Sequence, residues 1–264
     1  MGCARRTRSH GGLGRAGARA QRVARLAEEA FVPLTDHASA IAHLERPAYS
    51  YAEADRIAGA TRGTTKRWTR GYAYRTPTDQ RVARPPVTPG IEHPEAPGAS
   101  FLDLVEVAAI ARLKELGLSL GQIRGAVDVS QTLLDLRRPL VTERFRSDGR
   151  SVFVQQGDVL VELGFGPRKG RQAWDEVIGP FLETVEYESE LVRRWWPLGR
   201  THGVVIDPDF GFGLPVIADS GVRTEIVLEQ IEAGVDPASV ARDFGISRDD
   251  VDYALAFEAT RRER

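Results

Sequence analysis

The chain has 264 residues, of which 42% are hydrophobic and 28% charged, with a formal net charge of −1. This composition is ordinary for a globular protein that buries its own core. The single cysteine, Cys3, excludes a disulfide framework or a cysteine-based metal site, and it indicates a reducing compartment, so we expect a cytoplasmic protein. The apolar runs are too short to cross a membrane.

The small net charge conceals an asymmetry along the chain. Residues 48–84 hold eight basic and three acidic residues, whereas residues 201–264 hold six arginines and thirteen acids. DNA is attracted by the first segment and repelled by the second. Residues 1–27 carry seven arginines and no acid. This start is expected to be flexible, and it is either a phosphate-binding arm, a tail without a role or the product of a misplaced start codon.

A helix-turn-helix is predicted between residues 50 and 70. Ser50 and Glu53 have the spacing of a capping box, and a second short helix with a core-facing Trp68 follows the turn at Gly59-Ala60. No acid occurs from residue 56 to residue 75. Basic side chains on such a helix suit the major groove, where arginine bonds guanine edges. The residues predicted to contact DNA are Arg62, Thr64, Thr65, Lys66, Arg67, Arg70 and Arg75.

The middle of the chain is predicted to change from helices to strands. The proline-rich residues 77–97 are expected to form an irregular loop or distorted wing. A helix capped by Ser100 and a second helix over Leu120–Val127 follow. From Leu140 the apolar period becomes two. Strands are predicted for Arg144–Phe145 and Ser151–Val154 around an Asp-Gly turn, then for Val159–Leu163 and Tyr187–Trp196, with a helix over Gln172–Val185.

The C-terminal segment is predicted to be a second helix-turn-helix attached to two short strands, Val204–Ile206 and Leu214–Ile217. Thr224 is expected to cap its first helix, Asp236 its second and Ser247 its third. The last helix carries several acids, which would repel phosphates. We therefore expect this segment to support dimerisation or partner contact and not to read DNA.

Two known families resemble parts of this sequence. YAEADRIAGATRGTTKRWTRGY and FLDLVEVAAIARLKELGLSLGQIRGAV resemble the DNA-binding domain of MerR-type regulators, although the long C-terminal coiled coil and effector cysteines of that family are missing. The stretch from Val204, through Asp207-Pro208, Gly213–Ile217, Thr224 and Gly234, resembles domain of unknown function 433, which is associated with antitoxins. Together the halves resemble a VapB-type antitoxin, and this resemblance implies a PIN-domain ribonuclease as the toxin partner.

We therefore expect an α+β protein in four parts. Residues 1–47 form the basic segment, 48–130 a winged-helix-like, MerR-like DNA-binding domain, 131–199 a central β-hairpin and helix module, and 200–264 a C-terminal helix-turn-helix domain. The expected function is an antitoxin that represses its own operon at operator DNA; the alternatives are a transcription regulator without a toxin, and a purely structural interaction module. A homodimer is expected, because paired recognition helices suit palindromic operators. Toxin or partner contacts are assigned to Arg193, Arg194, Tyr253 and Phe257.

No enzymatic activity, cofactor or metal is predicted. The glycine-rich residues 164–170 lack the spacing of a phosphate-binding loop. The five histidines are scattered, and none forms a pair with the spacing of metal ligands on a helix. Asp207-Pro208-Asp209 is more simply a turn than a pair of catalytic acids.

Overall fold

A computed structural model describes residues 37–145, except 89, 92–94 and 116, and residues 176–262, except 177 and 189. The chain separates into two units, residues 1–39 and 40–264. Every element after the first helix, α2, belongs to the second unit. These elements are helices and two-stranded antiparallel sheets, so the predicted α+β class is confirmed.

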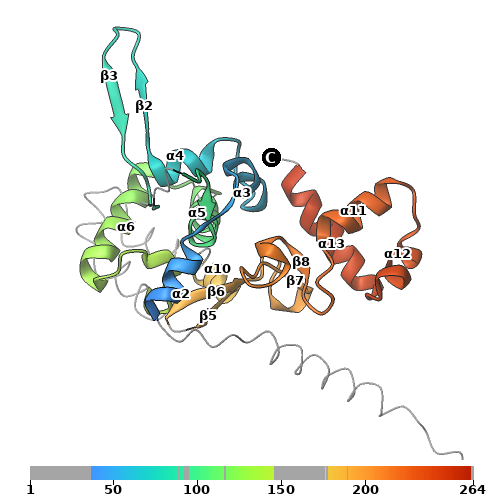
Figure 1. Cartoon of the computed structure of the whole chain (residues 1–264). Helices are drawn as coiled ribbons and strands as arrows, with labels where there is room; N and C mark the ends of the chain where they lie inside the picture. The colour runs from blue at the N-terminus through green and yellow to red at the C-terminus, as the bar shows by residue number, and fades with distance from the viewer. Residues whose placement is uncertain are drawn as a thin grey trace, which may run out of the picture. The chain divides into compact units, whose positions relative to one another are not determined.

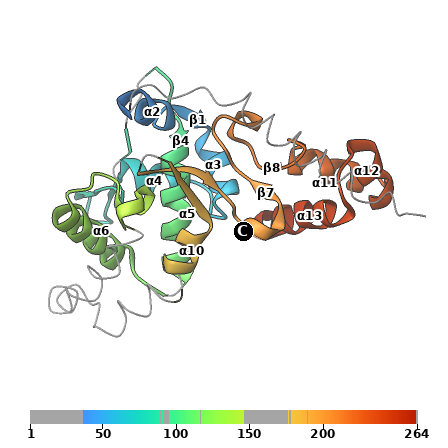
Figure 2. The ribbon, with the colours of Figure 1, turned by 90° about the horizontal axis from the view of Figure 1, so that it is seen from below.

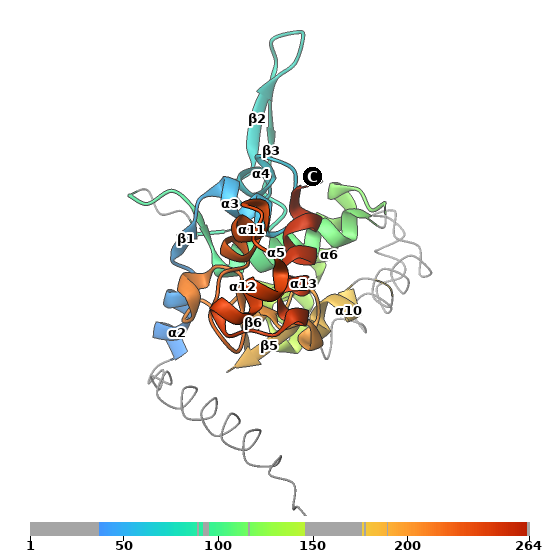
Figure 3. The ribbon, with the colours of Figure 1, turned by 90° about the vertical axis from the view of Figure 1, so that its right-hand side faces the viewer.

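The first half of the described chain holds a helix-turn-helix, a hairpin and two long helices (Figure 1). Its elements are α2 (His37–Leu44), β1 (Pro47–Tyr49), α3 (Tyr51–Ile57), α4 (Thr64–Arg70), β2 (Tyr72–Arg75), β3 (Arg81–Arg84), β4 (Ala99–Ser100), α5 (Phe101–Glu115) and α6 (Leu120–Leu134). Strand β1 pairs antiparallel with β4, and β2 with β3. The β2–β3 hairpin projects beyond α4 in two views (Figures 1 and 3).

The second half holds a hairpin, a strand pair and three helices. Its elements are η1 (Pro139–Val141), α10 (Gly179–Glu183), β5 (Val185–Glu188), β6 (Leu191–Trp195), η3 (Arg200–His202), β7 (Val204–Val205), η4 (Gly211–Gly213), β8 (Val216–Ile217), α11 (Thr224–Glu232), α12 (Pro237–Phe244) and α13 (Arg248–Arg262). The pairs β5–β6 and β7–β8 are antiparallel. Helices α11, α12 and α13 pack on one another (Figure 3).

Local capping signals fix the predicted helix starts. The Ser50 hydroxyl accepts a hydrogen bond from the backbone N–H of Glu53 at 3.1 Å and begins α3. Ser119 and Gln122 form a complete capping box at the start of α6. Asp236 caps α12 through the N–H groups of residues 238 and 239, with Pro237 in the first turn. These starts are confirmed because each depends on residues only two or three positions apart.

Two apolar clusters make the core. The larger one is built around α5 (Figure 2). Most residues of α5 from Phe101 to Leu113 are buried. A helix that buries residues on all its sides in this way lies inside its domain. This cluster also includes Val204, Ile206 and Phe257, so its packing extends past the boundary expected at residue 200. The smaller cluster lies within α11–α13 and the adjoining Ile217.

Two predictions about the first half are corrected and one is made more precise. For residues 77–97 an irregular loop or a distorted wing was expected, and residues 81–84 form the second strand of a wing, β3, which pairs in regular register with β2. The prolines at 85 and 86 come after β3 and do not interrupt it. Helix α6 runs seven residues beyond Val127, to Leu134. Arg144 and Phe145 lie in a helical turn, with Phe145 buried, and not in a strand. The turn at 147–150 and the strands predicted at 151–154 and 159–163 lie outside the described residues.

Two further predictions about the second half are corrected. The strand predicted over Tyr187–Trp196 belongs to the hairpin β5–β6, whose turn places Glu190 at a positive φ of 71°; an alternating pattern does not reveal a turn without glycine or proline. Thr224 is the first residue of α11 and not its cap. Its hydroxyl instead donates a hydrogen bond to Oε1 of Glu258 at 2.6 Å.

Candidate nucleic-acid interface

The start of α4 is held by a carboxylate from the preceding helix. Gly63, the residue before α4, has a left-handed backbone and no side chain to cap the helix. Asp55 of α3, which is 3% exposed, fulfils this role. It accepts hydrogen bonds from the N–H groups of Gly63 and Thr65, each at 2.6 Å. Asp55 therefore fixes the turn of the helix-turn-helix; sequence reasoning missed it because its partners are eight and ten residues away.

The inner face of α4 is formed by threonines. Thr64, Thr65 and Thr69 are at most 3% exposed. The Thr69 hydroxyl donates to the carbonyl of Thr65 at 2.8 Å. Thr64 and Thr65, both assigned to DNA from the sequence, thus face the protein and do not present their side chains to a groove.

Arg70, also assigned to DNA, ties α4 to α5. Its side chain is 10% exposed, and its Nη2 lies 3.4 Å from Oδ2 of Asp103. The same nitrogen donates to the carbonyl of Gly98 at 3.3 Å. Because the Arg70 guanidinium is bonded within the protein, it joins α4 to α5 and is not part of the exposed basic surface.

Asp103, the partner of Arg70, also belongs to a buried ionic cluster. Arg138 is 5% exposed and donates to Glu106 Oε2 from Nη2 at 2.8 Å and from Nε at 3.1 Å, and it also pairs with Asp103. Burial raises the pKa of the Glu106 carboxyl above its usual value, an effect that Arg138 and Thr88 oppose. Charged groups in the interior are stable only when they are paired, and Asp103, which pairs with both Arg138 and Arg70, links this cluster on α5 to α4.

The outer face of α4 carries the exposed cations. Lys66 and Arg67 on α4 are exposed, and so is Arg62 in the turn just before the helix. Arg67 makes only long contacts, at 3.4 Å to the Thr64 hydroxyl and 3.5 Å to the Arg62 carbonyl. Lys66 places its Nζ 5.9 Å from the centre of the Tyr51 ring. These three side chains form the basic face of α4.

The hairpin β2–β3, which we call the wing, adds a second basic surface. Tyr72 pairs with Arg84 and Tyr74 with Val82, so these four side chains share one face of the hairpin. The two tyrosine rings stack at 6.1 Å and remain 44% and 41% exposed. Arg84 donates to the Tyr74 hydroxyl at 3.4 Å. Sequence reasoning missed these tyrosines, although their spacing of two is the signal of a strand.

Arg75 and Arg81 are paired across the two strands and lie on the opposite face of the wing. Arg75, the last residue assigned to DNA from the sequence, is 66% exposed and forms an ion pair with Asp79 at 2.7 Å in the turn. A surface pair of this kind contributes little to stability, so Arg75 is free to exchange Asp79 for a phosphate. The structure brings Arg62, Lys66, Arg67 and Arg75 to exposed positions on adjoining elements.

The residues assigned to partner binding are mostly engaged inside the chain. Arg193 and Arg194 both bond the buried carboxylate of Asp207, at 2.7 Å and 2.6 Å. Phe257 is fully buried, with the Arg261 guanidinium 3.1 Å from its ring centre. Tyr253 is half-buried against the His202 ring, with the ring centres 4.8 Å apart. These contacts give all four residues a structural role.

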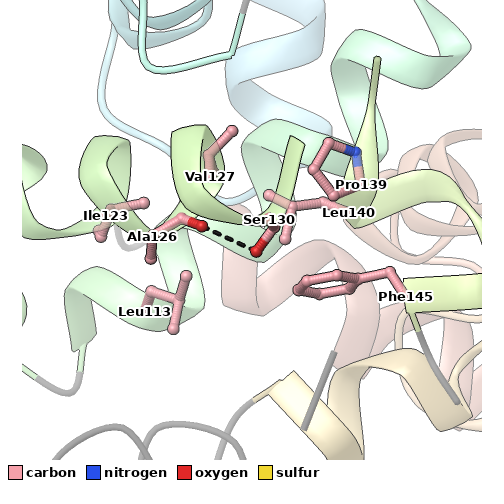
Figure 4. A pocket seen from close by; sticks show the side chains of 8 residues that line it. All are labelled: Leu113, Ile123, Ala126, Val127, Ser130, Pro139, Leu140 and Phe145. Atoms are coloured by element: carbon pink, nitrogen blue, oxygen red, sulfur yellow. Dashed lines mark hydrogen bonds between the residues drawn. The ribbon is translucent and has the colours of Figure 1, made fainter. Parts of the chain in front are cut away.

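An apolar cavity of about 10 Å³ lies between α5, α6 and η1 (Figure 4). Its lining residues are Leu113, Ile123, Ala126, Val127, Ser130, Pro139, Leu140 and Phe145. The one hydroxyl among them, that of Ser130, donates to the carbonyl of Ala126 at 2.8 Å. A space of this size holds at most one water molecule, so it is not an effector site.

The arrangement defines a winged helix-turn-helix protein that carries a second helix-turn-helix at its C-terminus. Residues 47–127 match the family described as "Putative DNA-binding HTH domain". Residues 204–257 match the family "Protein of unknown function (DUF433)". The predicted likeness to domain of unknown function 433 is thereby confirmed.

Relatives of the whole chain occur in Mycobacterium tuberculosis (strain ATCC 25618 / H37Rv). "Putative antitoxin VapB45" is 27% identical over 224 residues, which cover 79% of this chain and 92% of that protein. The "Uncharacterized protein Rv2308" is 23% identical over 233 residues, or 83% of this chain and 94% of that protein. The predicted resemblance to a VapB-type antitoxin is therefore confirmed.

The fold also occurs in a solved structure. The crystal structure of Rv2018 from Mycobacterium tuberculosis superposes with a TM-score of 0.61 at 23% identity, over 80% of this chain and 98% of that one. Within the part of the chain that the structure describes, no helix is long and apolar enough to span a bilayer. The same residues contain no group of three or more histidine, cysteine or acidic side chains arranged to hold a metal ion.

Proposed function

We propose that this chain is a cytoplasmic antitoxin that binds operator DNA through α4 and the wing and neutralises a PIN-domain ribonuclease. The observation that supports it most is the division of α4 into two faces. Its threonines and Arg70 are bonded to the protein, while Arg62, Lys66 and Arg67 are exposed. In this proposal the chain acts by binding and catalyses no reaction.

The exposed cations suit the major groove and the sugar-phosphate backbone of a DNA duplex. Helix α4 enters the major groove, where Arg62 and Arg67 reach guanine edges or phosphates. The wing follows the sugar-phosphate backbone with Arg75, Arg81 and Arg84, and the tyrosine hydroxyls add hydrogen bonds to phosphate. Each phosphate that a cation neutralises releases counterions, which supplies most of the affinity.

The C-terminal helix-turn-helix has a different role in this proposal. Its last helix, α13, exposes Asp249 and Asp252 where a recognition helix would face DNA, and Arg248 is paired with Asp252 at 3.3 Å. Carboxylates beside phosphates repel them. We assign this segment to partner binding, and we assign dimerisation to the chain as a whole because two-fold symmetric operators favour paired readers.

Single substitutions test the DNA-binding part. We expect Arg62→Ala and Lys66→Ala each to weaken binding of the full chain to a duplex from upstream of its own gene, by about tenfold for the removal of one cation from the interface. Arg223→Ala, which removes an exposed arginine before α11, is the matched control and should leave the affinity unchanged. Equal losses of affinity in all three variants would contradict the assignment of the interface to α4.

A ribonuclease assay tests the antitoxin part. A PIN-domain nuclease from the same operon should cleave RNA alone and lose this activity when one equivalent of the chain is added. The support for this part is the likeness to a protein named as an antitoxin. A nuclease that stays fully active in the presence of saturating chain would contradict it.

One observation favours a second candidate, a transcription regulator without a toxin. Arg193, Arg194 and Phe257, the residues assigned to the toxin from the sequence, are all engaged within the chain. An operon without a nuclease gene, together with intact operator binding, would support this alternative.

A further inference from the structure

The wing is joined to the rest of the protein by a short root at the end of each strand. Gly71 leads from α4 into β2, and Pro85 and Pro86 follow β3. The strands of the wing bond each other in regular register, and the hairpin projects beyond α4 (Figure 1). The direction in which the wing presents its cations is therefore set at this root.

Two consecutive prolines form the exit side of the root. Proline has no backbone N–H, and its ring holds φ at about −65°. Pro85 and Pro86 therefore donate no hydrogen bond from the backbone, while their two carbonyls remain strong acceptors. The carbonyls have a fixed direction and need donors from another part of the chain.

Arg124 of α6 supplies both donors. Its Nε donates to the carbonyl of Pro86 at 2.9 Å, and its Nη2 donates to the carbonyl of Pro85 at 2.9 Å. Two parallel bonds from one planar guanidinium fix orientation as well as distance. The partners are 38 and 39 residues apart, so this contact ties the wing to a helix that local sequence does not connect with it.

The segment that follows the prolines is bonded to the end of α4. The N–H groups of Val87 and Thr88 donate to the carbonyl of Trp68 at 2.7 Å and 3.2 Å, and the N–H of Gly90 donates to the carbonyl of Thr69 at 3.1 Å. The last carbonyls of a helix have no partner within that helix. The exit side of the root is therefore held by α4 through backbone bonds and by α6 through Arg124.

We propose that Arg124 is a positioning residue for DNA binding, which holds the wing at the angle where its cations reach phosphates while α4 lies in the major groove. This inference rests on the proposed function and names a residue of α6 that this function requires. A wing that is fixed before binding loses little conformational freedom on the DNA, so less of the binding energy is spent on ordering it. Arg124 acts through Pro85 and Pro86 and not through a phosphate of its own.

The position of the wing can be measured without DNA. Spin labels on Thr78→Cys in the wing turn and Asp128→Cys on α6, both exposed positions, are placed in the full chain with Cys3→Ser. We expect a narrow distance distribution by pulsed electron paramagnetic resonance, and a wider or shifted one in Arg124→Met. Arg137→Met, which removes an arginine that is 63% exposed, is the matched control and should leave the distribution unchanged. An unchanged distribution in Arg124→Met would overturn the inference.

Operator affinity then shows whether Arg124 acts through the wing. Arg124→Met should weaken binding about tenfold in the wild-type chain, and by a similar factor when Lys66→Ala is also present on α4. It should cause no further loss in Arg75→Ala/Arg81→Ala, because a wing without these cations gains nothing from being held in place. If Arg124→Met does not fold, Arg124→Lys keeps the stem and the charge but offers one nitrogen in place of two, and it should give smaller changes of the same kind.

The remaining outcomes separate this inference from the proposed function. Equal losses with and without the wing cations would mean that Arg124 contacts DNA itself or acts on overall stability, which overturns the positioning role and leaves DNA binding by the wing intact. Wild-type affinity in Arg75→Ala/Arg81→Ala would show that the wing does not bind DNA. That result overturns the wing's part of the proposed function, and the positioning role with it.

Discussion

At the scale of single residues, Asp55 is the group on which the DNA-binding face depends most. Its carboxylate satisfies two backbone N–H groups at the start of α4 from a position on α3. No side chain within α4 can replace it, because Gly63 occupies the capping position. The start of α4 is therefore held by one buried carboxylate.

Replacement of Asp55 tests this dependence. Asp55→Ala should lower the free energy of unfolding by about 1–3 kcal/mol, since it leaves buried donors without acceptors. Operator affinity should fall as well, although Asp55 is 3% exposed and touches no DNA. Urea denaturation and anisotropy titration measure the two effects. Asp128→Ala, an exposed acid on α6, is the control, and an equal loss of stability in that variant would contradict the account.

Arg138 is the second residue whose replacement should be severe. Arg138→Met leaves the buried carboxylate of Glu106 without its cation and leaves Asp103 with Arg70 alone, at 3.4 Å, which should cost about 3–5 kcal/mol. Arg137→Met is a matched control, because Arg137 is 63% exposed and lies 3.6 Å from Glu45. Thermal denaturation of both variants measures the difference, and comparable Tm values would show that the cluster is not essential.

The same substitution should make stability depend on pH. A carboxyl whose pKa is raised by folding binds a proton more tightly in the folded state, so its stabilising effect is present at low pH and disappears as the pH rises through the folded value. Burial already raises the pKa of Glu106, and Arg138 opposes this rise. The deficit of Arg138→Met should therefore be larger at about pH 8 than at about pH 5; a deficit independent of pH would contradict the assignment.

At the scale of elements, the junction between α4 and the wing depends on Gly71. This residue has a positive φ of 72°, and a Cβ on it would lie 2.6 Å from the carbonyl oxygen of Arg84. Gly71→Ala should force the wing away from α4, lower stability by about 1–3 kcal/mol and weaken operator binding. Gly121→Ala is the control: a Cβ there meets only the Ser119 hydroxyl at 3.9 Å, and alanine favours the helix. Retained DNA affinity in Gly71→Ala would contradict a role for the wing.

The elements also show what the sequence can and cannot reveal. Helices α5 and α12 and the strand pair β7–β8 were predictable, because caps and apolar periods lie within each segment. The division of α4 into a buried and an exposed face was not predictable from its sequence. Threonine suits a groove or a core equally, and the burial of Thr64 and Thr65 depends on how α4 packs against α3 and α5. Arg70 was predicted to contact DNA because its partner Asp103 lies 33 residues away in the sequence and cannot be recognised from local spacing.

At the scale of the whole molecule, the last helix is joined to the first helix-turn-helix. Glu258 of α13 is 3% exposed, lies 3.0 Å from the Arg56 guanidinium of α3 and accepts a hydrogen bond from Thr224. Arg261 adds a bond from its Nε to the carbonyl of Ile57 at 3.0 Å. The two helix-turn-helices therefore share a polar junction as well as the larger apolar cluster.

This junction predicts that the two ends of the second unit unfold together. Glu258→Ala should lower the free energy of unfolding by about 1–3 kcal/mol, because the buried Thr224 hydroxyl loses its short hydrogen bond and keeps only the 3.4 Å contact with the Pro215 carbonyl. Asp252→Asn, which alters an exposed ion pair on the same helix, should change it by less than about 1 kcal/mol. Calorimetry checks both values. Two separate transitions in the wild-type chain would contradict the shared junction.

The salt dependence of operator affinity distinguishes DNA binding by α4 and the wing from DNA binding by the C-terminal helix-turn-helix. We compare two variants that each remove two positive charges. For Lys66→Ala/Arg67→Ala we predict a weaker affinity and a slope of log K against log salt that is shallower by about 0.9 for each phosphate that is no longer neutralised. For Arg242→Ala/Arg248→Ala, in α12 and α13, we predict the wild-type slope. A shallower slope in the second variant and a wild-type slope in the first would contradict the account.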